Sequence, residues 1–79
     1  MAKVLLFGAL HDVAGWRTRD IDAASLQALT ALLSSEDPAL GEALAGKGVQ
    51  VAIDQVIVRG DVALGPATEV AFLPPMSGG

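Results

Sequence analysis

The sequence predicts an α+β domain, in which a mixed five-stranded sheet packs on one main helix plus a short second helix. Three observations favour this fold class. Apolar residues alternate with a period of two near both ends of the chain, as they do in strands. Between these regions, leucines recur at the spacing of one helical face. The length of 79 residues provides enough chain for one domain only.

The N-terminal segment predicts two strands joined as a hairpin. Residues 3–8 form a compact run of β-branched and aromatic side chains, in which Val4 and Leu6 share one face. The segment 11–16, "HDVAGW", supplies turn residues. Residues 17–22 alternate enough to form a second, exposed strand. We therefore expect a β-hairpin with a turn between its two strands.

Two helices are expected in the middle of the chain. Ser25 is a suitable N-cap, because its hydroxyl can accept a hydrogen bond from a first-turn amide. The apolar face of the main helix, expected over residues 25–35, comprises Leu26, Leu29 and Leu33, and Leu32 widens it. A second, short helix is predicted to begin after Asp37, with Pro38 at its first position, and to end near Gly46.

The C-terminal part of the chain predicts the remaining strands. Residues 49–54 and 56–58 have the period of strands and flank a turn at residues 54–55. Residues 61–64 predict a brief extended piece, and residues 69–73 the last strand. An amphipathic helix between a first and a second hairpin is the order expected of a ubiquitin-like β-grasp domain.

Composition and charge exclude several classes of function. Nine acidic residues outnumber five basic ones, so the net charge is −4 and there is no electrostatic footprint for nucleic acid. An acidic domain is expected to meet a basic partner surface instead. The chain has no cysteine and a single histidine, so neither a thiolate nucleophile nor a metal site is expected.

The chain also has no candidate membrane segment. No apolar run approaches the roughly 18–20 residues that span a bilayer. The first apolar run is followed by acidic sequence rather than by a cleavage site, so we interpret it as a strand and not as a signal peptide. A cytoplasmic location is therefore expected.

Ordinary catalytic arrangements are not found in the sequence. None of the serines lies in a nucleophile elbow, and the glycines do not form a phosphate-binding loop. His11 and Asp12 are adjacent, which is more typical of a solvated surface pair than of a catalytic one. Asp20 and Asp22 would share one side of a strand, where charges discourage aggregation. Trp16 is expected to cover the end of the core, or else to be a contact residue.

The end of the chain offers different chemistry. We expect a domain over residues 1–73 and an extended tail over residues 74–79, "PPMSGG". Prolines at its root end the strand ladder because they have no N–H to donate. Met76 suits an apolar groove of a partner, and Gly78 and Gly79 lack Cβ atoms, so their backbone can enter a narrow channel. Six extended residues reach up to about 20 Å.

The terminal carboxylate is the group that such a tail would deliver. It is inert until one of its oxygens attacks the α-phosphate of ATP, after which the acyl-adenylate accepts a nucleophile at carbon. A terminal Gly-Gly therefore suits a carrier that is activated by another enzyme. A frayed end without a role would have the same residues, so the pattern alone leaves both interpretations open.

Along essentially its whole length, the chain resembles the small subunit of molybdopterin synthase. The matching stretches are "KVLLFGAL" at 3–10, "DVAG" at 12–15, "VQVAIDQ" at 49–55 and "EVAFLPPMSGG" at 69–79. The last stretch is specific, because it combines a hydrophobic strand, Pro-Pro, an apolar residue, a small hydroxyl residue and Gly-Gly. The other stretches are shared by many β-grasp chains.

The resemblance implies a function as a sulfur carrier. Gly79 would be adenylated by an E1-like activating enzyme that consumes ATP, and then thiocarboxylated with sulfur from a sulfurtransferase. In a heterotetramer with the large synthase subunit, Gly79 would donate sulfur to cyclic pyranopterin monophosphate, as a step of molybdenum cofactor biosynthesis. The pterin-binding and acid–base residues would belong to the large subunit. The small subunit would bind no metal and no permanent cofactor.

The resemblance also assigns residues to the partner interface. The residues expected to insert into the partner's channel are Pro74, Pro75, Met76, Ser77 and Gly78. The candidates for the partner-facing surface are Phe72, Leu73 and Arg59.

The chain departs from the family pattern at three places. An Arg-Glu pair is usual where His11 and Asp12 stand, an Asn is common at Asp54, and a Gly-Asp turn is frequent at residues 65–68. These departures affect the expected charge of the partner-facing surface and the last turn, but not the tail.

Three different functions stay open beside that of the synthase subunit. A carrier for thiazole or cysteine synthesis also ends in Gly-Gly, although the Phe-Leu-Pro-Pro approach argues against it. The second is a protein modifier that is attached to lysines through Gly79. The third is a β-grasp binding module with an idle tail.

Overall fold

The computed structural model describes residues 1–75, and these form a five-stranded mixed sheet in the order β2-β1-β5-β3-β4. The strands are β1 (Ala2–Leu6), β2 (Thr18–Ile21), β3 (Gln50–Ile53), β4 (Val56–Val58) and β5 (Glu69–Leu73). The pairing of β1 with β5 is parallel, and the other three pairings are antiparallel. The predicted mixed sheet is therefore confirmed, with the last strand in its centre.

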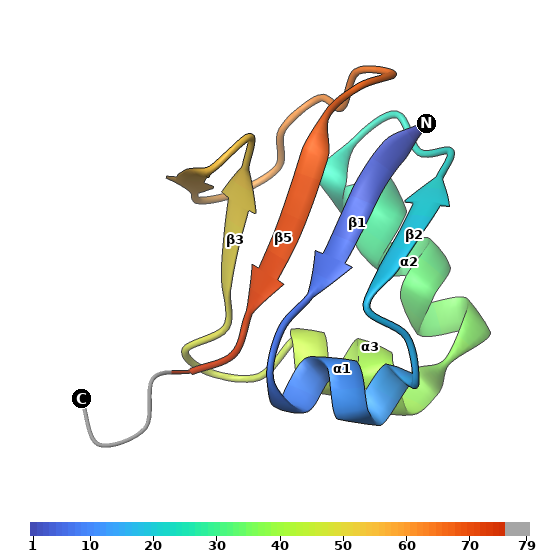
Figure 1. Cartoon of the computed structure of the whole chain (residues 1–79), viewed down its shortest axis with the longest axis vertical. Helices are drawn as coiled ribbons and strands as arrows, with labels where there is room; N and C mark the ends of the chain where they lie inside the picture. The colour runs from blue at the N-terminus through green and yellow to red at the C-terminus, as the bar shows by residue number, and fades with distance from the viewer. Residues whose placement is uncertain (76–79) are drawn as a thin grey trace.

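The helices leave one face of this sheet uncovered within the described part of the chain. Helix α2 (Leu26–Glu36) crosses behind the sheet, while α1 (Ala9–Ala14) and α3 (Pro38–Leu44) lie at the end where β1 and β5 finish (Figure 1). Of the helices within residues 1–75, none combines the length and the apolar character that a bilayer crossing demands.

The turn predicted between the first two strands is wrong, because the chain forms α1 there. Gly8, with φ at 56°, turns the chain from β1 into α1, and Leu10 buries its side chain in the core at 3% exposure. Gly15, in the left-handed region, ends the helix by donating its N–H to the carbonyl of His11. A helix with one buried residue has no periodic apolar pattern, so the sequence carried no signal for it. The antiparallel pairing of β1 with β2 is nevertheless confirmed.

The predicted helix caps are confirmed. The Ser25 hydroxyl accepts a hydrogen bond from the Ala28 amide at 3.1 Å, and the Asp37 carboxylate accepts one from the Leu40 amide at 3.2 Å. Each bond satisfies an amide that has no partner within the first turn. Asp61, for which the sequence predicted no role, accepts from the amide of Gln27 at 2.8 Å and so ties the extended segment before the last turn to α2.

The turn predicted at residues 54–55 is confirmed, and it is fastened to β5. Asp54 and Gln55 both have positive φ, at 48° and 71°, as the tight hairpin between β3 and β4 requires. The Asp54 amide donates to the carbonyl of Glu69, and the Asp54 carboxylate accepts from the amide of Glu69, both at 2.9 Å. Aspartate tolerates this backbone region better than most residues.

Trp16 covers the end of the core, as expected. Arg19 lies above its ring, with the guanidinium carbon 5.1 Å from the ring centroid, and pairs with Glu36 at 2.9 Å. The hydrogen bond from Arg19 lowers the pKa of Glu36 below its ordinary value. This contact joins β2 to the end of α2.

The core lies between the sheet and the helices. Its largest fully buried side chains are those of Phe72, Leu29, Leu33, Leu40, Val4 and Val70. Leu32 does not belong to it, because its side chain is 38% exposed, so the expectation that it widens the apolar face of the helix is wrong. Where α2 meets α3, a Cβ on Gly41 would lie only 2.7 Å from the Cα of Ser34, so the two helices approach closely at a glycine.

We predict that Leu29→Ala destabilises the domain by about 2–5 kcal/mol, because it removes buried methyl groups and leaves a cavity. Leu32→Ala, in the same helix, should cost less than about 1 kcal/mol, because its side chain is partly solvated. Urea unfolding followed by circular dichroism measures both. Equal losses for the two variants would contradict the described packing of α2.

Candidate functional site at the root of the tail

The candidate site lies where β5 ends and the tail begins. The last paired residue of β5 is Leu73, which faces Gln50 of β3. Pro74 and Pro75 follow, and neither has an N–H with which to extend the ladder. The predictions for Met76, Ser77, Gly78 and Gly79 concern residues that lie outside the described part of the chain. The structure therefore describes the root of the tail and its surroundings.

Two glycines contact the prolines of the root. A Cβ on Gly8, at the start of α1, would lie 2.9 Å from Pro74 Cγ. A Cβ on Gly48, in the loop before β3, would lie 2.9 Å from Pro75 Cβ. Both glycines have positive φ, at 56° and 85°, which side chains rarely allow. We call this arrangement of Gly8, Gly48, Pro74 and Pro75 the glycine cradle.

The cradle was not predicted from the sequence. Gly8 was the last residue of the first predicted strand, and Gly48 directly precedes the third, where glycine is ordinary. The contact with prolines far away in sequence arises only from the sheet order. The signal that could have suggested a change of direction at Gly8 was a glycine at the end of an apolar run, immediately before the turn residues of segment 11–16.

Phe72 is not a partner-facing residue in this structure, so that expectation is wrong. Its side chain is 1% exposed and packs in the core, because the register places it beside Leu6 and Val51 on the helix-covered side. Its carbonyl accepts a hydrogen bond from the amide of Phe7 at 3.3 Å. Phe72 thus anchors the strand that carries the tail.

Unlike Phe72, both Leu73 and Arg59 are accessible enough to face a partner. Leu73 is half-buried on the uncovered side of the sheet, and Arg59 is exposed directly after β4. Arg59 lines a hollow of about 380 Å³ together with Ile57 and Gly48 of the cradle. The assignment of these two residues to an interface stays a prediction.

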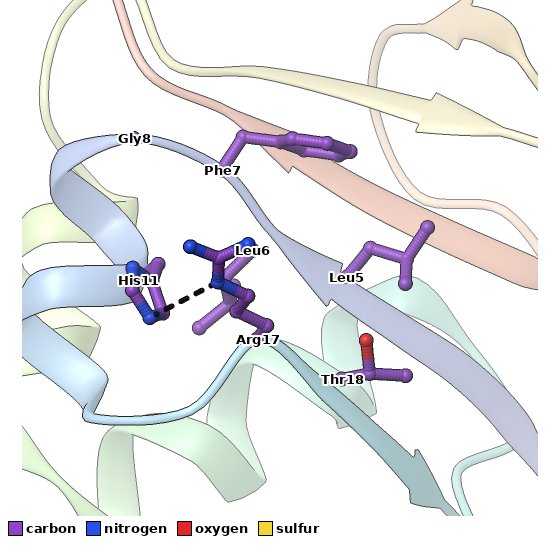
Figure 2. A pocket seen from close by; sticks show the side chains of 7 residues that line it. All are labelled: Leu5, Leu6, Phe7, Gly8, His11, Arg17 and Thr18. Carbon is purple, nitrogen blue, oxygen red and sulfur yellow. Dashed lines mark hydrogen bonds between the residues drawn. The ribbon is translucent and has the colours of Figure 1, made fainter.

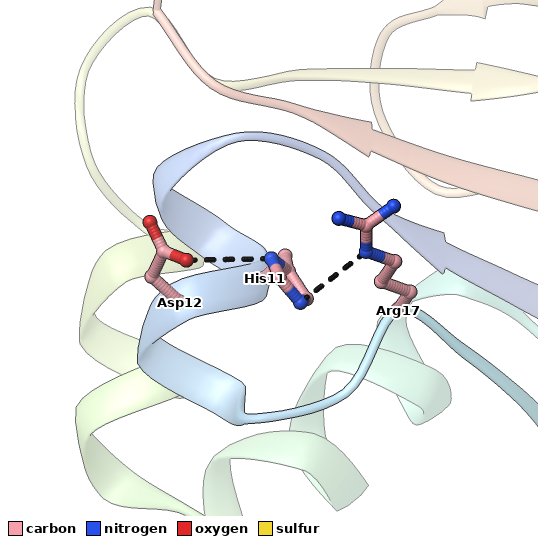
Figure 3. A network of polar contacts seen from close by, with 3 residues as sticks. All are labelled: His11, Asp12 and Arg17. Carbon is pink, nitrogen blue, oxygen red and sulfur yellow. Dashed lines mark hydrogen bonds and ion pairs between the residues drawn. The ribbon is translucent and has the colours of Figure 1, made fainter.

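A second hollow, of about 260 Å³, opens next to the cradle, where β1 and β2 adjoin α1 (Figure 2). Its lining residues are Leu5, Leu6, Phe7, Gly8, His11, Arg17 and Thr18. Arg17 Nε donates a hydrogen bond to His11 Nε2 at 3.4 Å, and His11 Nδ1 lies 3.3 Å from a carboxylate oxygen of Asp12 (Figure 3). The ring proton of a neutral His11 therefore belongs on Nδ1, facing Asp12.

This arrangement does not form a catalytic site within the described residues. The nitrogen of His11 that could act as a base already accepts a hydrogen bond from Arg17, and no serine lines the hollow. The described serines include Ser25, which caps α2, and Ser34, which packs against Gly41. Among residues 1–75 no cluster of three or more His, Cys, Asp or Glu side chains could hold a metal ion.

Asp20 and Asp22, which were expected at a solvated strand edge, are both exposed, and β2 is an edge strand of the sheet. Asp20 lies in β2, and Asp22 directly follows Ile21, the last residue of that strand. Lys3 stands opposite Asp20 in the sheet, so the charge of this edge is partly balanced.

The fold and the site define a class of protein. A β2-β1-β5-β3-β4 sheet whose central strand is the last one and is followed by Pro74 and Pro75 defines a ubiquitin-like β-grasp domain. The chain belongs to the ThiS family, whose model matches residues 4–79.

Solved structures agree with this assignment. SAMP1 from Haloferax volcanii is similar, with 28% sequence identity and a TM-score of 0.85 over 99% of this chain and 98% of that one. The small archaeal modifier protein 1 (SAMP1) from Methanosarcina acetivorans has the same fold, with a TM-score of 0.86 over 99% of this chain and 95% of that one, at 23% identity. No curated protein sequence matches the chain.

The cradle predicts that alanine substitutions at the four glycines with positive φ lower the stability of the domain by different amounts. Alanine at Gly15 or Gly60, where nothing lies within 4 Å of the added methyl group, should cost about 1–2 kcal/mol of backbone strain only. Alanine at Gly8 or Gly48 also collides with a proline ring, so we expect a further loss of about 1–3 kcal/mol. At Gly8 the backbone strain is larger as well, because its φ of 56° and ψ of −132° lie outside the left-handed helical region that Gly15 occupies.

Urea unfolding measures the stability of these variants, and the ¹³C chemical shifts of Pro74 and Pro75 report the position of the root. We expect the proline shifts to change in Gly8→Ala and Gly48→Ala, but not in Gly15→Ala and Gly60→Ala. Unchanged proline shifts in all four variants would mean that the cradle does not hold the root.

Proposed function

We propose that this protein is a sulfur carrier, and that its terminal Gly79 is the group that carries the sulfur. The observation that supports this most strongly is the Gly-Gly terminus of a ThiS-family chain, placed after a Pro-Pro root at the end of the central strand. The described domain contributes no catalytic site of its own. The reactive group is then the terminal carboxylate, and the domain presents it to other enzymes.

The chemistry needs an E1-like adenylating enzyme and ATP. A carboxylate oxygen of Gly79 attacks the α-phosphate of ATP, and pyrophosphate leaves. A sulfide equivalent from a sulfurtransferase then attacks the acyl carbon, AMP leaves, and a thiocarboxylate results. ATP is consumed by the activating enzyme, so this chain itself needs no bound cofactor.

The proposed acceptor is cyclic pyranopterin monophosphate, in the large subunit of molybdopterin synthase. The stiff Pro74–Pro75 root would aim the tail, Met76 and Ser77 would fill the channel of that subunit, and Gly78 would let the terminus reach its end. Two such deliveries build the dithiolene of molybdopterin. The resemblance of residues 69–79 to the small synthase subunit supports this acceptor.

A second candidate function is that of a protein modifier. It is favoured by the two archaeal relatives, since both are described as SAMP1 and one of them as a small archaeal modifier protein. In that case a lysine amine of a target protein, rather than sulfur, would attack the activated Gly79. The two functions share the adenylation step and differ in the acceptor.

The first test is the mass of the intact protein after incubation with an E1-like enzyme, ATP and a sulfurtransferase with its sulfur source. We expect the mass to rise by the difference between one sulfur and one oxygen, located at Gly79. A chain that lacks Gly79 is the control and should not change. No exchange, under conditions that thiocarboxylate a known carrier, would contradict the sulfur-carrier function.

The second test identifies the acceptor. The thiocarboxylated chain is mixed with a large synthase subunit and cyclic pyranopterin monophosphate, and separately with a thiazole-forming enzyme and with candidate target proteins. Formation of molybdopterin, with return of Gly79 to a carboxylate, supports the proposal. Isopeptide bonds to lysines would favour the modifier function instead.

A narrow partner channel predicts a graded effect of side chains at Gly78. Gly78→Val should leave the free energy of unfolding unchanged, because the substitution lies outside the domain, and should reduce sulfur delivery strongly. Gly78→Ala should have an intermediate effect. The rate of molybdopterin formation in single-turnover mixing measures both, and unaltered delivery by Gly78→Val would show that no narrow channel is involved.

A further inference from the structure

The amino groups of the chain lie at two opposite ends of the sheet. The sequence contains two lysines, Lys3 and Lys47, besides the N-terminal amine of Met1. Lys3 pairs with Glu69 at the start of β5, and the Met1 amine donates a hydrogen bond to the carbonyl of Pro66 at 3.1 Å. Both amines are therefore at the end of the sheet away from the tail. Lys47, in the loop before β3, is the amine at the end where the tail starts.

Lys47 is held at the tip of a turn that contacts the root of the tail. The Val49 amide donates to the carbonyl of Gly46 at 3.4 Å, so Lys47 and Gly48 are the central residues of a four-residue turn. Gly48 has φ at 85°, a left-handed value that glycine supplies in such turns. A Cβ on Gly48 would lie 2.9 Å from Pro75 Cβ, and Figure 1 shows this loop beside the end of β5. The backbone of Lys47 is thus fixed next to the root.

The side chain of Lys47 is available for chemistry. The residue is exposed, and its neighbours on both sides, Gly46 and Gly48, have no side chains that could cover it. Neither of the two ion pairs found within residues 1–75 involves Lys47, so no described carboxylate neutralises its ammonium group. A lysine amine at the end of a flexible four-carbon stem is a nucleophile in its neutral form. An acyl group that comes close to this turn can therefore be attacked by Lys47.

The chain beyond Pro75 is long enough to bring its last carbon to Lys47. Four residues follow Pro75, and when extended they span up to about 13–14 Å. Lys47 is one residue from the contact of Gly48 with Pro75, which is well inside that span. The partner of Lys3 is Glu69, six residues before Pro75, which is roughly 20 Å along the strand and beyond that span. The reach of the terminus therefore selects Lys47 among the amines of the chain.

We propose that Lys47 is an internal acceptor, which closes the chain on itself through an isopeptide bond when Gly79 has been activated and no sulfur arrives. The proposal rests on the proposed function for the activation of Gly79. The neutral Nζ of Lys47 attacks the acyl carbon of the Gly79 adenylate, the bond from that carbon to the AMP oxygen breaks, and AMP leaves with the electron pair. The nitrogen then releases a proton to water. The product is a ring of residues 47–79 without a free terminal carboxylate, so it can no longer be activated.

Proximity decides between ring closure and attack by another molecule. A short connection between two reacting groups gives an effective concentration in the millimolar range. At about 10 μM protein, this favours Lys47 of the same chain over a lysine of a second copy by roughly 100-fold. Sulfur transfer is the competing route, because a channel that holds the terminus extended also holds it away from Lys47. Ring closure is therefore the fate of an activated terminus that leaves the activating enzyme without sulfur.

A thioester on Gly79 tests the placement of Lys47 without any activating enzyme. The full chain is prepared with this thioester by cleavage of an intein fusion with a small thiol. At mildly alkaline pH the folded protein should release the thiol and become lighter than the free acid by the mass of one water. The rate should not depend on protein concentration, because the reaction is intramolecular. Mass spectrometry of the digested product should show Lys47 joined to Gly79.

Two lysine variants serve as the test and its matched control. Lys47→Arg keeps the charge and removes the nucleophile, so ring formation should be slower by about 100-fold, and hydrolysis should replace it. Lys3→Arg should close at the rate of the unmodified chain. Both positions are exposed, so the free energy of unfolding should stay the same in both variants. Unaltered ring formation in Lys47→Arg, or a linkage to Lys3 or to the Met1 amine, would overturn the proposal.

An E1-like enzyme with ATP, but without a sulfur source, tests ring closure after enzymatic activation. Hydroxylamine in a parallel sample traps an activated Gly79 as a hydroxamate. We expect the hydroxamate in that sample and the ring without hydroxylamine. If the hydroxamate forms but the ring does not, Gly79 is activated and the internal acceptor is wrong. If neither forms, the activation of Gly79 in the proposed function is wrong, while the thioester measurement still decides whether Lys47 is placed to attack the terminus.

Discussion

The placement of β5 between β1 and β3 is the constraint on which the rest of the structure depends. β1 and β5 are parallel, and Leu6 pairs with Phe72. Gly8, two residues after Leu6, therefore lies next to Pro74, two residues after Phe72. β3 is antiparallel to β5, and Gln50 pairs with Leu73. Gly48, two residues before Gln50, therefore lies next to Pro75, two residues after Leu73. The glycine cradle is therefore a continuation of the two strand registers past the end of the sheet.

The strands and the helix starts could be predicted, because the signals for them lie within a few residues of each other. These signals are the period-two segments and the capping residues Ser25 and Asp37. Helix α1 was not predicted, because Leu10 is its one buried residue and a single buried residue gives no apolar periodicity. The role of Phe72 was misjudged because β5 is central: Val70, Ala71 and Phe72 are all buried, so alternation does not separate its two faces. The cradle requires φ angles and a sheet order that no local pattern contains.

The polar side chains of the described domain have structural rather than chemical roles. Within the described residues, the polar side chains that resemble catalytic ones have structural tasks: Ser25 and Asp37 cap helices, Asp54 fastens a hairpin to β5, and His11 orients Arg17. None is left as a base next to a nucleophile. Under the proposed function, the reactive group is the carboxylate of the last residue, and the described domain presents it to other enzymes.

The central position of β5 also has a mechanical consequence. An enzyme that draws the chain beyond Pro75 into a channel pulls along the axis of β5. That strand is bonded on both sides, to β1 over four register positions and to β3 over four, so the load falls on both ladders at once, in shear. A ladder loaded in shear must lose many hydrogen bonds together, whereas a strand at the edge can be peeled away one bond at a time. The tail can therefore be held under tension by a partner while the domain behind it stays folded.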